Sequence, residues 1–73
     1  MKNMYDVQQF LKKFGTYIYI GDRLADLELM ESEIKELFMS QLIERQDLQM
    51  ALQVIRTEIQ LEKEKREGVM KHE

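Results

Sequence analysis

Aromatic residues and a net positive charge coincide in the first third of the chain, a pairing that suits single-stranded nucleic acid. Residues 1–23 hold five of the six aromatic residues and a net charge of +2, whereas residues 24–73 carry −5. Proteins that bind single strands stack bases on aromatic rings and follow the phosphates with cations. The pattern predicts stacking on Tyr17 and Tyr19, with phosphate contacts from three cations: Lys12, Lys13 and Arg23.

The same residues also fit ordinary packing, so this alternative stays open. Phe10 and Phe14 lie on an apolar helical stripe, which predicts that they belong to the core. Of Tyr17 and Tyr19, one is expected to be buried with its hydroxyl in water. The whole chain has a net charge of −3, which opposes phosphate binding at long range and argues against tight binding of a duplex.

Catalysis and metal or cofactor binding find little support in the composition. The chain has no cysteine, and its single histidine, His72, is next to the last residue. Nucleophilic catalysis needs an activated side chain beside a base, and no hydroxyl residue here has an obvious partner. Asp22 and Asp26, four residues apart, could help to hold a divalent cation. The simpler interpretation is that Asp22 caps a helix and Asp26 is solvated beside Arg23. We therefore predict no enzyme, no metal site and no cofactor.

Neither a membrane span nor an export signal is predicted. The longest purely apolar or aromatic run is Tyr17–Ile20, whereas a spanning helix needs about 20 apolar residues. The first six residues lack the apolar stretch of a signal peptide. We expect a cytoplasmic protein with no membrane association.

Apolar spacing predicts a first helix and an extended connector. The helix runs over about residues 4–14, is capped by Asn3 and ends at Gly15, which can adopt the left-handed conformation. Thr16–Ile20 alternates like a strand, but no second strand is available to pair with it. We predict an extended or single-turn connector that packs Ile18 and Ile20 onto the bundle.

Two longer helical regions follow. Asp22 is the predicted cap of the second, whose apolar residues continue to about residue 42 with a possible pause at Met30–Ser32. The third is expected over about residues 45–67, with a stop at Gly68. The chain is thus predicted to be all-α: a small three-helix bundle with a long C-terminal helix, forming one domain over residues 1–67 with a frayed tail over 68–73.

The third helix supports a different function. It is expected to overhang its partners, and a second apolar stripe, consisting of Met50, Val54 and Leu61, runs beside its main one. Either the second helical region covers this stripe or another chain does. The alternative to nucleic-acid binding is therefore a protein-interaction module, or weak self-association, through these three residues.

Several short runs resemble one family of small bacterial proteins. They include Tyr5–Gln9, Gly15–Thr16 and Ile18–Tyr19, and the most specific is Gly21–Asp26, Gly-Asp-Arg-Leu-Ala-Asp. Together with matches further along, over about residues 4–60, the chain resembles the YqgQ-like family of Bacillus and its relatives. The resemblance implies a three-helix bundle in the bacterial cytoplasm and no enzyme activity, because the family is uncharacterised. Single-stranded nucleic-acid binding is the suggestion attached to this kind of fold.

Overall fold

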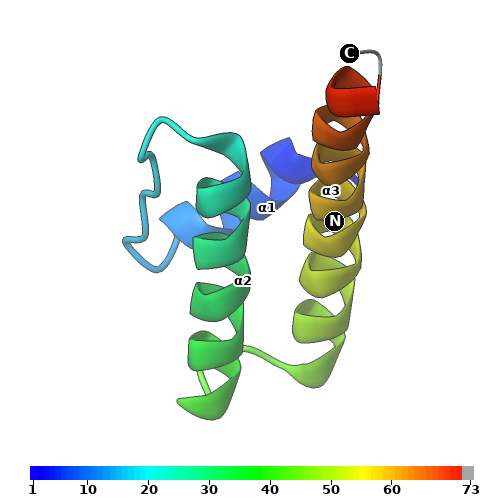
Figure 1. The fold of residues 1–73 in the computed structure, drawn as a ribbon. Helices are drawn as coiled ribbons and strands as arrows, with labels where there is room; N and C mark the ends of the chain where they lie inside the picture. Colours follow the sequence, from blue (N-terminus) through cyan, green and yellow to red (C-terminus); the bar gives the residue numbers. More distant parts are fainter. Residues whose placement is uncertain (72–73) are drawn as a thin grey trace.

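The computed structural model describes residues 1–71, with the backbone alone over residues 68–71. These residues form three helices and no strand: α1 spans Met4–Lys12, α2 spans Arg23–Met39 and α3 spans Arg45–Lys71. Helices α2 and α3 lie antiparallel as a hairpin, and α1 packs across them (Figure 1). The predicted all-α, three-helix architecture with a long C-terminal helix is confirmed.

The sequence signals for helix ends work largely as predicted. Asn3 accepts a hydrogen bond from the Asp6 N–H, and Asp22 accepts one from the Ala25 N–H at 2.9 Å. Gly15 has a φ of 80°, and the N–H of the next residue, Thr16, donates to the Leu11 carbonyl. This is the Schellman motif that ends α1. A short side chain at each start and a glycine after the first helix thus set where α1 and α2 begin and where α1 stops.

Three local predictions were wrong. Helix α2 is continuous, with no pause at Met30–Ser32, because Met30 and Ile34 are both buried and hold the helix across the candidate cap. Helix α3 passes through Gly68 to Lys71, since one glycine costs a helix only about 1 kcal/mol. Phe14, expected in the core, is 37% exposed in the turn between the end of α1 and Gly15, and it packs edge-on against Phe10. The frayed tail was predicted over residues 68–73. Its last two residues, 72–73, lie outside the described residues.

One apolar core joins the three helices. Each contributes at a spacing of three or four residues, as an amphipathic helix must. The buried residues are Met4, Val7 and Leu11 of α1; Leu27, Met30, Ile34 and Leu37 of α2; Ile43; and Ala51 and Ile55 of α3. No helix in residues 1–71 combines the length and apolar character needed to cross a membrane.

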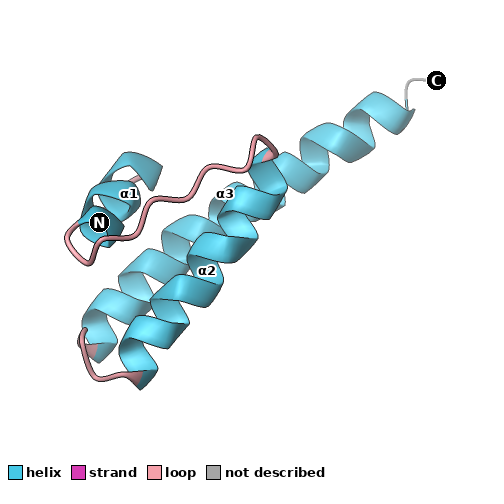
Figure 2. Ribbon diagram, turned by 90° about the vertical axis from the view of Figure 1, so that its left-hand side faces the viewer, coloured by secondary structure: helices cyan, strands magenta, loops and turns pink. Residues whose placement is uncertain are grey.

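Ion pairs hold α2 and α3 together outside the core. Two of them join the helices, Arg23–Glu58 at 3.1 Å and Arg56–Glu31 at 3.0 Å, and a third joins Arg66 of α3 to Asp22, the cap of α2, at 3.0 Å. Each partner is partly exposed, so solvent screens these pairs and each contributes little to stability. The third pair lies near the start of α2, beyond which α3 extends alone (Figure 2). The predicted overhang of the third helix is confirmed, since α3 has 27 residues against 17 in α2.

Candidate nucleic-acid interface

The connector between α1 and α2 carries the two candidate stacking residues. It is bounded by Gly15 and Gly21, which have φ values of 80° and 97°. Near one end the Thr16 N–H donates to the Leu11 carbonyl at 3.1 Å, and near the other the Ile20 N–H donates to the Asp26 carboxylate at 2.7 Å. The connector is therefore anchored to α1 at one end and to α2 at the other.

Both tyrosines of the connector face solvent. Tyr17 is 75% exposed and Tyr19 is 88% exposed, whereas Ile18 between them packs against the core. The expectation that one ring is buried was wrong. The physical reason is the alternation of an extended segment, in which neighbouring side chains point to opposite sides. Ile20, which was predicted to pack like Ile18, is 57% exposed.

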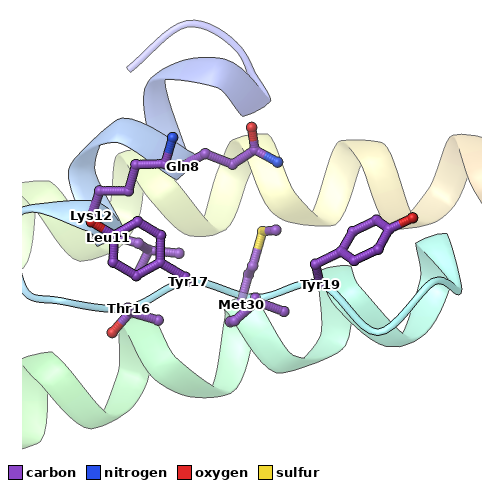
Figure 3. Close-up of a pocket in the computed structure, with 8 residues that line it drawn as sticks. Gln8, Leu11, Lys12, Thr16, Tyr17, Tyr19 and Met30 are labelled. Atoms are coloured by element: carbon purple, nitrogen blue, oxygen red, sulfur yellow. The ribbon is translucent and has the colours of Figure 1, made fainter.

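A shallow pocket of about 330 Å³ lies between α1, the connector and α2. Its apolar lining comes from all three elements, and Gln8, Lys12 and Thr16 supply polar groups. Met30 lies between the two rings, and Tyr17 and Tyr19 lie at opposite ends of the pocket (Figure 3). The full lining is Gln8, Leu11, Lys12, Thr16, Tyr17, Ile18, Tyr19 and Met30. The arrangement offers two separate stacking surfaces, with Lys12 at the Tyr17 end of the pocket (Figure 3).

The other two predicted phosphate contacts do not line this pocket. Lys13 is exposed at the end of α1. Arg23 donates to the Glu58 carboxylate at 3.1 Å and lines a different pocket, against the acidic side of α3. The structure thus brings together Lys12, Tyr17 and Tyr19 of the predicted set.

Asp26 is the residue of this region whose role was misjudged from the sequence. It was expected to be solvated beside Arg23, but it is 8% exposed and accepts the Ile20 N–H, while Arg23 pairs with Glu58. The signal was available in the spacing. Position 26 continues the buried stripe of Met30 and Ile34 by one helical turn, so a short polar residue there must find a partner inside the fold.

The two carboxylates considered for a cation turn to different partners. Asp22 accepts from the Ala25 N–H and from Arg66, whereas Asp26 accepts from the Ile20 N–H. The backbone hydrogen bond from Ala25, followed by that from Arg66, lowers the pKa of Asp22 from its ordinary value of 3.8. Within residues 1–71 no group of three or more acidic or histidine residues could hold a metal ion.

The second apolar stripe of α3 is only partly open. Val54 is half-buried, packs against the core and lines a small pocket with Met1 and Asn3. Met50 is also half-buried, and Leu61 is 49% exposed among charged neighbours. The N-terminal residues before α1 therefore lie near Val54, the part of this stripe that packs against the core.

Comparison with known proteins places the chain in a family. The model of the YqgQ-like family matches residues 1–61. The chain is also 43% identical over 67 residues to a Bacillus subtilis (strain 168) protein described as "Uncharacterized protein YqgQ", covering 92% of this chain and 94% of that protein. The chain therefore belongs to the YqgQ-like family, as its short motifs indicated.

Proposed function

We propose that this member of the YqgQ-like family is a small, non-enzymatic cytoplasmic module that binds single-stranded RNA or DNA. The observation that carries the proposal is a pair of tyrosines, 75% and 88% exposed, on a connector fixed at both ends beside a lysine-rimmed pocket. Because the connector backbone is anchored, an exposed ring on it needs little reorganisation before a base stacks on it. Each stacked base contributes about 1–3 kcal/mol in known single-strand binders.

The electrostatics predict a weak and salt-sensitive complex. The chain is acidic overall, with a net charge of −3, and Arg23 is already paired with Glu58. Lys12 is the lysine of the pocket, and Lys13 is next to it in sequence. Single strands lose affinity with a slope of about −0.7 in log K against log salt for each phosphate contacted. One or two contacts therefore give a slope between about −0.7 and −1.4.

Fluorescence anisotropy with short labelled RNA and DNA oligonucleotides tests the proposal. Changing Tyr19 to Ala removes one stacking surface and is expected to weaken binding by about 5-fold or more, the lower end of the stacking range. Tyr5 is the matched control, because it is 66% exposed on α1 and does not line the pocket. Tyr5→Ala should bind like the parent chain.

The charge contribution has its own pair of variants. Lys12→Gln is expected to weaken binding and flatten the salt dependence by about 0.7 in slope. Lys63→Gln removes the same charge from an exposed position on α3 and is expected to leave the slope unchanged. No binding to either oligonucleotide at low salt would refute the proposal, as would equal effects from the two lysine variants.

The alternative function, a protein-interaction module on α3, rests on Leu61. This residue is 49% exposed, whereas Val54 of the same stripe packs against the core. Leu61→Glu is therefore the informative variant, since Val54→Glu would disturb the fold itself. If Leu61→Glu abolished capture of a partner while oligonucleotide binding was absent, the α3 function would replace the one proposed above.

A further inference from the structure

The segment Thr16–Ile20 is a strand-like segment without a partner strand. All five residues are β-branched or aromatic, the types that favour strands, and none is charged or proline. It runs as an elongated stretch alongside α2 (Figure 2), and no strand forms anywhere in residues 1–71. A marked preference for strand pairing is thus left unused within the molecule.

The backbone of this segment has free hydrogen-bonding groups. Its two end N–H groups are occupied, by the Leu11 carbonyl at Thr16 and by Asp26 at Ile20. Within residues 1–67, the three N–H groups between them, of Tyr17, Ile18 and Tyr19, donate to no other group, and the carbonyls of residues 16–20 accept from none. Such groups are satisfied by water or by another chain.

The alternation of an extended backbone identifies which edge is open. Successive residues direct their N–H and C=O groups to opposite edges of a strand. The Ile20 N–H points to Asp26 on α2, so Ile18 shares that inner edge. Tyr17 and Tyr19 therefore direct their backbone groups to the other edge, and both residues are largely exposed, at 75% and 88%.

We propose that this edge pairs with the same segment of a second copy of the chain, antiparallel about a two-fold axis at Ile18. In this register Tyr17 of one copy lies opposite Tyr19 of the other. By symmetry, Tyr19 of the first copy lies opposite Tyr17 of the second. Both are hydrogen-bonded pairs, so they use the N–H and C=O groups of the open edge.

The side chains fit the same arrangement. Each Tyr17 ring lies beside a Tyr19 ring on one face, a favourable cross-strand aromatic pair. The segment carries no charge, so two copies do not repel along the ladder. Gly15 and Gly21 turn the chain away at either end through positive φ values, which confines the pairing to five residues. A ribbon of this size gives a weak dimer, populated at high protein concentration. This inference does not depend on nucleic-acid binding.

Nuclear magnetic resonance on a mixture of labelled and unlabelled chains tests the register directly. Residues opposite each other without hydrogen bonds have Cα atoms about 4.5 Å apart, so an intermolecular contact between the two Ile18 Hα protons is expected. Raising the protein concentration should slow amide exchange at Tyr17 and Tyr19 but not at Ile18. The sedimentation mass should rise toward that of a dimer over the same range.

Two substitutions at the exposed position 19 separate the contribution of the backbone N–H to the dimer from that of the tyrosine ring. Tyr19→Pro removes the N–H from the open edge and is expected to restore the monomer mass at every concentration. Tyr19→Ala keeps that N–H and should weaken the dimer while preserving the Ile18 contact, with circular dichroism confirming that both variants fold. A monomer mass throughout for the parent chain would overturn the proposal. So would a dimer unaffected by Tyr19→Pro, or one broken by Leu61→Glu.

Discussion

Replacing Asp26 with alanine should loosen the connector that carries the two exposed tyrosines. Asp26 is 8% exposed and accepts the Ile20 N–H at 2.7 Å, a short hydrogen bond to a carboxylate in a partly buried setting. Hydrogen bonds to charged groups contribute about 1.5–3 kcal/mol, and removing the acceptor leaves the Ile20 N–H without its partner. We expect the free energy of unfolding to fall by about that amount, a large share of the roughly 4–11 kcal/mol that a chain of this length has.

The same change should weaken the proposed oligonucleotide binding without touching the pocket. Holding one backbone residue in a single conformation costs about 1–2 kcal/mol, and a released connector must incur this cost when it binds. If one residue is reordered, the Kd should rise by about 5- to 30-fold. Asp26→Asn keeps a carbonyl acceptor and is expected to fall between the parent chain and Asp26→Ala in both measurements.

Glu28→Ala is the matched control for this experiment. Glu28 is exposed on the same helix and forms no ion pair with the side chains of residues 1–67, so the variant loses one negative charge without losing an anchor. Urea unfolding gives the stability, amide exchange at Ile20 reports on the anchor, and anisotropy gives the affinity. If Asp26→Ala matched Glu28→Ala in all three, the anchoring role of Asp26 would be refuted.

Two further predictions concern helix ends. Gly15 and Gln41 both have positive φ after a helix, 80° and 61°. A left-handed backbone conformation costs a residue with a side chain about 1–2 kcal/mol. In urea unfolding, Gly15→Ala should therefore lower the free energy of unfolding by about 1 kcal/mol, and Gln41→Gly should raise it by at most about 1 kcal/mol. The two substitutions must change the free energy of unfolding in opposite directions, and changes in the same direction would contradict this account. The second prediction follows from the lowered pKa of Asp22, whose contribution to stability is present above its ordinary value of 3.8 and is lost as pH falls through the folded value. Asp22→Asn keeps a capping oxygen but does not titrate, so its thermal melts should depend less on pH below about 4 than those of the parent chain, and identical pH profiles would count against the link.

The sequence predicted the interactions between residues close together in the chain, but not those between residues far apart in it. The caps Asn3 and Asp22 and the stop at Gly15 act within a few residues of themselves, and all three are present as predicted. In contrast, Glu58 lies 35 residues from its partner Arg23, and Asp22 lies 44 residues from Arg66, so no local pattern indicates either pair. Arg23 was therefore assigned to phosphate binding, although the fold places Glu58 within 3.1 Å of it.

The connector shows why the exposure of single residues is hard to predict. The sequence predicted a connector that packs Ile18 and Ile20 onto the bundle, but it left open which of Tyr17 and Tyr19 faces solvent. That choice depends on Ile18 packing against residues brought together by the fold, which leaves both rings in solvent. Asp26 sits on the buried stripe of α2, yet its partner is a backbone N–H in an irregular segment. Periodicity can place such a carboxylate in the interior without naming its partner.

The proposed site also bears on how firmly α1 is held. A helix of nine residues is too short to be stable alone in water, so α1 depends on burying Met4, Val7 and Leu11 against the hairpin. The pocket is lined from both sides of this contact, by Gln8 and Lys12 of α1 and by Met30 of α2. A ligand that fills it binds only the docked arrangement, and binding to a folded state alone stabilises that state. Oligonucleotide binding should therefore slow amide exchange throughout α1, including residues that the ligand does not touch.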